Sequence, residues 1–248
     1  MDDRQRVQHS RSFDSVADAY DRARPSYPGT AVSWLLGAAP LRVLDLAAGT
    51  GAFTRPLLEA GHIVLAADHL PSMLAHLRRR SSSPALAVVA ASAEQLPLRD
   101  ATFDAITVAQ AYHWFDEASA VPELARVLRP GGVLALLWNQ RDRTIPWVRR
   151  LGELMGSDDL HPDPSGTLGL SGFFGAVEWR RFRLYQPLNR DDLIDLVRSR
   201  SYVAVLGDAE RQRLLRRVGE LYDEQRGDAI GLQMPYWTHC LRVTRLSG

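Results

Sequence analysis

A glycine turn, followed some distance later by an acidic side chain, is the feature of this sequence best suited to chemistry. The turn reads Gly49-Thr50-Gly51 and follows an apolar run over residues 42–46. Glycine lets the backbone approach a ligand closely, and a helix that begins beyond the turn offers unpaired N–H groups. Asp68 ends the next apolar run, at about the twenty-residue spacing of a carboxylate that binds the two hydroxyls of a ribose. The pattern predicts a nucleoside site at the carboxyl edge of an open sheet.

Two classes of nucleoside ligand compete for such a turn. A dinucleotide site uses a third glycine, so that the pyrophosphate rests on the helix N-terminus, and residues 51–54 lack it. Asp45 also belongs to the turn, where its carboxylate would repel a pyrophosphate. S-adenosylmethionine carries a sulfonium and an amino group but no phosphate, so it tolerates that carboxylate. A nicotinamide dehydrogenase is therefore the less favoured interpretation.

Strands and helices must alternate to bring these residues to one edge. The apolar runs expected as strands cover residues 42–46, 62–67, 86–91, 103–109, 132–138, 176–184 and 233–244. The segments with helical spacing cover residues 14–24, 31–39, 52–60, 71–80, 116–128, 147–155, 191–198 and 209–225. This alternation predicts an α/β fold with a mostly parallel sheet and helices on both faces. The apolar runs are continuous, as expected for strands buried on both sides.

Five segments, in chain order, resemble motifs of the class I S-adenosylmethionine-dependent methyltransferases. They are Asp45 to Gly51, Asp68, Ser92 to Pro97, Phe103-Asp104, and Arg126 to Gly132. Two departures are visible: Ala47 stands where a glycine is common, and Ser92 where an aspartate is usual. The resemblance implies a Rossmann-like, doubly wound sheet of seven strands whose last strand is antiparallel. It also implies S-adenosylmethionine as cofactor, with Asp68 on the ribose and residues 92–94 around the adenine.

A narrower resemblance involves the segment after the fourth expected strand. Residues 110–116, Gln-Ala-Tyr-His-Trp-Phe-Asp, resemble the small-molecule subgroup that contains trans-aconitate methyltransferase, as do Phe13-Asp14 and residues 20–25. In this interpretation Arg24 pairs with the methionine carboxylate, which a guanidinium can bind through two hydrogen bonds, and Tyr20 covers it. Arg24 as a solvated surface charge is an equal alternative. The subgroup is broad in substrate, so the acceptor stays unnamed.

The acceptor is expected beside His113 and Trp114, because open α/β sheets place substrates beyond the carboxyl ends of their strands. His113 is the candidate catalytic base if the acceptor is a phenol or hydroxyl; a carboxylate acceptor needs no base. Packing in an aromatic cluster is the alternative for both. The expected acceptor-binding residues are Tyr112, His113, Trp114 and Trp147. The expected cofactor-binding residues are Tyr20, Arg24, Asp45, Ala47, Gly49, Gly51, Asp68, His69, Met73, Ser92, Ala93, Glu94, Ala109 and Gln110.

Composition excludes several other chemistries. All 30 Lys+Arg residues are arginine, against 29 acidic residues, so no Schiff-base or phosphate-loop lysine exists. The net charge of +1 gives no basic surplus for nucleic acid or an anionic membrane. The single cysteine, Cys240, excludes an intrachain disulfide and a multi-cysteine metal site. We expect a cytoplasmic monomer or homodimer that acts on a small molecule, without a metal, a nucleic-acid partner or a membrane span.

The 248 residues are expected to form one domain. Its parts are an N-terminal helical cap (1–40), a cofactor-binding half (41–140), a loop-rich lid insertion (141–175) and the C-terminal part of the sheet (176–248). Two other functions stay open. One is a non-catalytic or repurposed S-adenosylmethionine-binding protein, which would keep the same cofactor site. The other is an RNA or protein methyltransferase, which the lack of a basic appendage disfavours.

Overall fold

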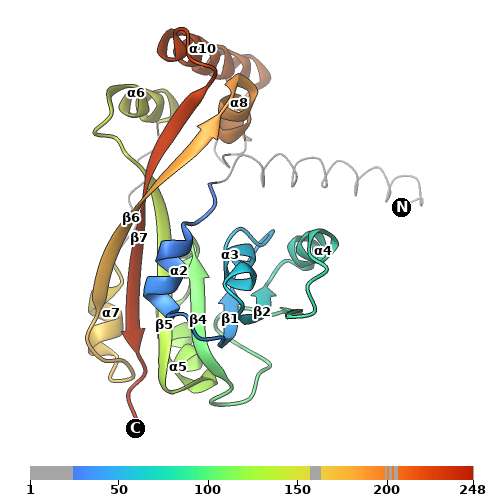
Figure 1. The fold of residues 1–248 in the computed structure, drawn as a ribbon, viewed down its shortest axis with the longest axis vertical. Helices are drawn as coiled ribbons and strands as arrows, with labels where there is room; N and C mark the ends of the chain where they lie inside the picture. Colours follow the sequence, from blue (N-terminus) through green and yellow to red (C-terminus); the bar gives the residue numbers. More distant parts are fainter. Residues whose placement is uncertain (1–24, 157–162, 199, 201–202, 204–205, 248) are drawn as a thin grey trace, which may run out of the picture. The chain divides into compact units, whose positions relative to one another are not determined.

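The computed structural model describes residues 25–156, 163–198, 200, 203 and 206–247 (Figure 1). Seven strands form one sheet in the order β3-β2-β1-β4-β5-β7-β6. The strands are β1 (Arg42–Leu46), β2 (Ile63–Asp68), β3 (Leu86–Ala90), β4 (Phe103–Ala109), β5 (Leu128–Arg141), β6 (Glu178–Leu188) and β7 (Leu232–Thr244). The helices are α2 (Gly29–Leu36), α3 (Thr54–Glu59), α4 (Pro71–Arg80), η1 (Tyr112–Trp114), α5 (Glu117–Val127), α6 (Pro146–Met155), α7 (Ser165–Leu170), α8 (Arg190–Arg198) and α10 (Asp208–Arg226). The helix expected over residues 14–24, with Tyr20 and Arg24, lies outside the described residues.

The strand directions confirm the predicted sheet. β1 pairs in parallel with β2 and β4, β2 with β3, and β4 with β5. β7 runs against β5: the Gly131 N–H donates to the Arg245 carbonyl, and farther along the Asp142 N–H donates to the Pro235 carbonyl. The fold is therefore a Rossmann-like α/β sheet with an antiparallel last strand. The carboxyl ends of β1, β2 and β4 consequently meet at one edge.

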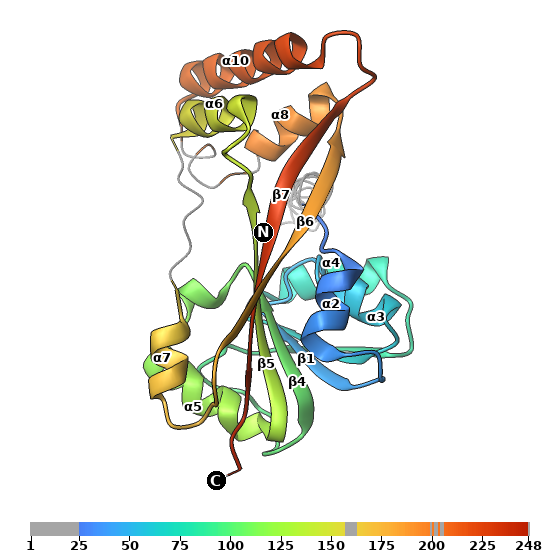
Figure 2. The same ribbon diagram turned by 60° about the vertical axis from the view of Figure 1, so that its left-hand side comes forward.

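Two apolar cores cover the two faces of this sheet. Residues of α5, among them Val121 and Leu124, pack with β4 and β5 in one core. Residues of α2, α3 and α4 pack against the other face, where Leu35, Leu57 and Leu77 are buried. Figure 2 shows these strands nearly edge-on, with α2, α3 and α4 on one side and α5 and α7 on the other. Helices on both faces explain why the strands are apolar in continuous runs.

The chain divides into two compact units. Of the described residues, the larger unit contains 26–140, 163–184 and 237–247, which include β1 to β4 and α2 to α5. The smaller unit contains Pro25 and the described residues between 141 and 156 and between 185 and 236, and in it α10 packs on α6 and α8. Ion pairs join Arg150 to Glu224 and Arg190 to Asp223 on these helices. The single-domain organisation stays a prediction.

Local structure differs from the sequence expectation at several points. β6 continues to Leu188 rather than ending at residue 184, and α2 covers Gly29–Leu36 rather than residues 31–39. β5 extends beyond residues 132–138 at both ends, because its backbone pairs with β7 from Gly131 onward. The expected loop-rich insertion contains the short helix α7, which buries Leu168. Two glycines in its six residues lower the helix propensity of α7, so tertiary packing determines it. η1 was not expected because three residues give no periodic pattern.

Candidate functional site

The turn after β1 has the backbone geometry that a ligand-binding loop requires. Gly49 and Gly51 have φ angles of 56° and 89°, and Ala47 has a φ of 54°. A side chain at Gly51 would place its Cβ 2.3 Å from Leu77 Cδ1, whereas a Cβ at Gly49 would meet nothing within 4 Å. Gly51 is therefore needed for close packing, and Gly49 faces open space. Ala47 stands where the family that the sequence resembles commonly has glycine, and its left-handed backbone gives the physical reason.

Asp68 holds this turn from the end of β2. Its Oδ2 accepts a hydrogen bond from the Gly49 N–H at 2.9 Å, and its Oδ1 accepts one from the Leu70 N–H at 2.9 Å. The residue is 5% exposed. A carboxylate has about four lone-pair sites, so each oxygen can still accept another hydrogen bond. The structure thus brings together the glycine turn and the acid that the spacing predicted, while His69 beside Asp68 is exposed.

Asp45 lies beneath the turn and is buried. Its Oδ2 accepts a hydrogen bond from the Thr54 hydroxyl at 2.6 Å, and its Oδ1 accepts one from the Thr107 hydroxyl at 2.8 Å. Burial raises the pKa of Asp45 to about 6. Asp45 therefore ties β1 to β4 and to the first residue of α3. This is a positioning role, and direct contact with a cofactor stays a prediction.

The segment after β3 lies at the same carboxyl edge of the sheet as Asp68. The Ala91 N–H donates to the Asp68 carbonyl at 3.1 Å, and Ser92 forms a bridge with Gln95. Glu94 Oε1 accepts the Asp116 N–H at 3.1 Å, which links this segment to the start of α5. Ala93 is buried, and Met73 on α4 is half-buried. The expected adenine segment thus lies next to the turn after β2.

The end of β4 carries a second strained backbone position. Gln110 has a φ of 62°, and its side-chain amide donates to the Asn139 carbonyl at 3.1 Å. Ala109, the last residue of β4, pairs with Leu137 of β5. Left-handed non-glycine residues cost free energy and cluster at functional sites. Ala47 and Gln110 both follow the carboxyl ends of strands that are neighbours in the sheet.

The expected acceptor residues have different surroundings. Tyr112 is 1% exposed and packs on Phe115, with ring centroids 5.8 Å apart; its ring belongs to the core. Burial lowers the pKa of His113, which is partly buried. Trp114 is 79% exposed, and its ring centroid lies 4.8 Å from that of His113. Trp147 is half-buried at the start of α6, in the smaller unit, and its role stays a prediction.

Sequence reasoning missed an aromatic and cationic wall on β5, β6 and β7. Trp138 and Trp179 stack with ring centroids 6.3 Å apart. The Arg181 and Arg183 guanidinium groups lie 4.4 and 3.9 Å from the Trp237 ring centroid. Trp179 is 46% exposed although Trp138 is buried. Alternation along β6 places residues 179, 181 and 183 on one face. This two-residue period is the sequence signal from which the wall could have been predicted.

The wall lies at the carboxyl edge of the sheet. Trp138 follows Leu137, which pairs with the last residue of β4, so the stacked pair begins where β4 ends. Trp138 belongs to the same core as Tyr112. The wall and η1 are therefore on one face of the sheet. Burial and the nearby Arg181 charge lower the pKa of His239, so the imidazole on this face favours its neutral form.

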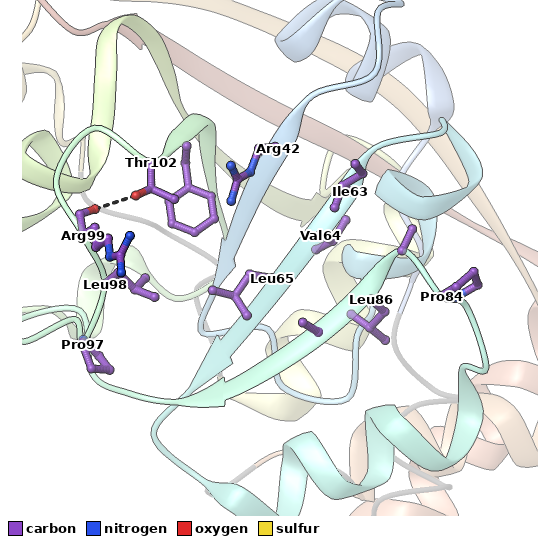
Figure 3. A pocket seen from close by; sticks show the side chains of 13 residues that line it. Arg42, Ile63, Val64, Leu65, Pro84, Leu86, Pro97, Leu98, Arg99 and Thr102 are labelled. Carbon is purple, nitrogen blue, oxygen red and sulfur yellow. Dashed lines mark hydrogen bonds between the residues drawn. The ribbon is translucent and has the colours of Figure 1, made fainter.

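A pocket of about 430 Å³ lies at the opposite edge (Figure 3). Its lining includes Arg42, Ile63, Leu86 and Phe103, which are the first residues of β1, β2, β3 and β4. We call it the amino-edge pocket. Because Asp68 and the glycine turn lie at the other ends of these strands, this pocket is not the predicted nucleoside site.

Two further findings concern only the described part of the chain. It contains no group of three or more His, Cys, Asp or Glu side chains that could hold a metal ion. None of its helices is long and apolar enough to cross a membrane.

Comparison with known proteins identifies the family. Residues 44–136 match the family model described as a methyltransferase domain. An uncharacterized methyltransferase of Mycobacterium tuberculosis is 45% identical over 244 residues, which cover 95% of this chain and 96% of that protein. A demethylmenaquinone methyltransferase of Thermus thermophilus is 45% identical over 112 residues, 43% of this chain and 51% of that protein. A solved structure from Anaeromyxobacter dehalogenans, also named as a methyltransferase, has a TM-score of 0.71 and 26% identity, and covers 91% of this chain and 99% of its own. The glycine turn, the acid at the end of β2 and these relatives together show that the chain belongs to the family of S-adenosylmethionine-dependent methyltransferases.

Proposed function

We propose that this enzyme transfers a methyl group to a small-molecule acceptor at the carboxyl edge of the sheet. The observation that carries the proposal is the Asp68 carboxylate bonded to the Gly49 N–H at 2.9 Å. This contact positions an acid and an open glycine turn side by side. Two ribose hydroxyls would donate to the remaining lone pairs of Asp68, and the turn would approach the rest of the nucleoside.

The residues around this edge fit S-adenosylmethionine. No described residue comes within 4 Å of a Cβ placed at Gly49, so the described part of the chain leaves the position beside the turn open. The segment of Ser92, Ala93 and Glu94 follows β3 next to Asp68, where it would frame the adenine. Gly51, Ala47 and Asp45 would shape the turn, while His69, Met73, Ala109 and Gln110 would line it. Arg24 and Tyr20, outside the described residues, would hold the methionine carboxylate.

S-adenosylmethionine, when bound, supplies a methyl group activated by a sulfonium. The chain itself has to orient the acceptor and exclude water, since the cofactor provides the reactivity. His113 and Trp114 follow β4, and the stacked pair of Trp138 and Trp179 lies on the same face of the sheet. These groups would hold the acceptor. If the acceptor is a hydroxyl or phenol, His113 takes its proton. The lowered pKa of His113 keeps the imidazole neutral and able to accept that proton near pH 7.

A small, flat acceptor is favoured over a macromolecule. The indole of Trp179, which is 46% exposed and stacks on the buried Trp138, offers a planar apolar surface of the kind that aromatic rings stack on. The partial match to a demethylmenaquinone methyltransferase supports a small substrate. The resemblance of residues 110–116 to the trans-aconitate methyltransferase subgroup points the same way. The net charge of +1 gives little attraction for nucleic acid.

The test is a labelled methyl-transfer assay with S-adenosylmethionine and a cell extract divided by ultrafiltration. Label should enter the low-molecular-weight fraction and be unaffected by prior nuclease and protease treatment. Label confined to the macromolecular fraction and lost after nuclease or protease would refute the small-molecule assignment. Binding of S-adenosylhomocysteine without transfer to either fraction would support the non-catalytic alternative.

A further inference from the structure

The amino-edge pocket exists because one face of β2 and β3 lacks a covering helix. The connection from β3 to β4, residues 91–102, is fully described and contains no helix. On the opposite face, α3 and α4 pack against β2. Apolar side chains are left accessible as a result: Ile63 is 58% exposed, Leu65 is half-buried and Ala87 is exposed. The pocket thus has an apolar floor that no part of the described chain covers.

One wall of the pocket is held rigidly by α5. The Arg126 guanidinium donates to the Leu98 carbonyl at 2.8 Å and to the Leu96 carbonyl at 3.1 Å. Glu123 accepts the Leu96 N–H at 2.8 Å. The Thr102 hydroxyl donates to the Arg99 carbonyl at 2.9 Å, the bond drawn dashed in Figure 3. The loop carrying Leu98 and Arg99 is therefore fixed before any ligand arrives, which lowers the entropy cost of binding.

The pocket carries two positive charges that the described residues do not neutralise. The Arg42 and Arg99 side chains form no ion pair with any described carboxylate, and both are exposed. The acids nearby in the sequence are occupied: Asp104 pairs with Arg129 and accepts the Arg42 backbone N–H, and Asp100 pairs with Arg126. Figure 3 shows Arg42 and Arg99 on the side of the pocket where Thr102 lies, with Leu86 toward the other side. Apolar side chains adjoin both charges: Leu98 lies beside Arg99 in Figure 3, and Ile63 is the register partner of Arg42.

We propose that the amino-edge pocket binds a small amphipathic carboxylate, with its acid group on Arg42 and Arg99 and its apolar body on Ile63, Leu65 and Leu98. Guanidinium groups bind carboxylates through paired hydrogen bonds. The volume of about 430 Å³ lies within the range of about 300–1,000 Å³ typical of small-molecule sites. The site is separate from the cofactor edge, so it does not depend on the proposed methyl acceptor.

Calorimetry with three probe acids, octanoate, 4-phenylbutyrate and 1-naphthylacetate, tests the proposal. At least one should bind wild type, and its uncharged alcohol should bind about tenfold more weakly. Arg42→Gln and Arg99→Gln should each weaken binding of that acid about five- to tenfold. Arg213→Gln, which removes an exposed arginine of α10 in the smaller unit, should leave it unchanged.

A second variant tests the floor of the pocket. Ala87→Glu places a carboxylate on the exposed face of β3 and should abolish binding of the acid by charge repulsion. Affinity for S-adenosylhomocysteine should be unchanged in this variant, which verifies that the sheet is intact. If none of the three acids binds wild type, the proposal is wrong. It is equally wrong if an acid binds Arg42→Gln, Arg99→Gln and Ala87→Glu as tightly as wild type.

Discussion

Replacement of Asp68 by alanine should weaken cofactor binding strongly while the fold is kept. The change removes the acceptor of two backbone N–H groups, those of Gly49 and Leu70, and the carboxylate expected to bind the ribose. A hydrogen bond to a charged group is worth about 1.5–3 kcal/mol. Affinity for S-adenosylhomocysteine should therefore fall by about 10- to 150-fold. The free energy of unfolding should fall by about 1–3 kcal/mol, because two partly buried donors lose their acceptor.

The chain offers a matched control at the other edge of the same sheet. Asp104 also accepts a backbone N–H from a neighbouring strand, that of Arg42 at 2.8 Å, but it lies at the start of β4. Asp104→Ala should lower stability without changing cofactor affinity. Titration calorimetry measures the affinities, and denaturant unfolding measures the stabilities. Equal affinity of wild type and Asp68→Ala, or an equal loss in both variants, would refute the assignment of Asp68.

Three further variants test the turn, the acceptor side and the buried acid. Gly51→Ala should lower the free energy of unfolding by about 1–3 kcal/mol in a denaturant titration, because its Cβ would meet Leu77 and its φ is positive; a neutral result would contradict the packing seen here. His113→Ala should leave cofactor affinity unchanged and lower kcat by about 10²- to 10⁴-fold if His113 is the base. Wild-type activity should then fall as pH drops through a His113 pKa that burial places below its usual value; loss of cofactor affinity instead would assign His113 to the cofactor site. Asp45 has a pKa of about 6 in the folded state against 3.8 as its ordinary value, so the folded state binds more protons and its contribution to stability decreases as pH rises from about 4 to 7. Asp45→Asn should reduce that pH dependence in unfolding titrations, and an unchanged slope would rule out Asp45 as its source.

The sequence by itself determined the cofactor half of the site. β1 and β4 lie where the apolar runs predicted them, and Asp68 meets the glycine turn after β1. These features depend on local signals: glycine at positive φ, continuous apolar strands, and the helical segments α3 and α4 that follow β1 and β2. Parallel strands joined by such helices bring their carboxyl ends to one edge. Consequently, the acid could be assigned to the turn from spacing alone.

Only the tertiary structure showed which residues surround the expected cofactor site. The Thr107 hydroxyl bonded to Asp45 is 62 residues away in the chain, and no periodicity predicts such a pair. Trp138 and Trp179 stack across β7, which lies between β5 and β6, an order that local propensity does not encode. The amino-edge pocket likewise depends on a connection that runs without a helix past an exposed strand face. Contacts between segments distant in the chain require the whole fold, and these contacts form the acceptor wall and the pocket.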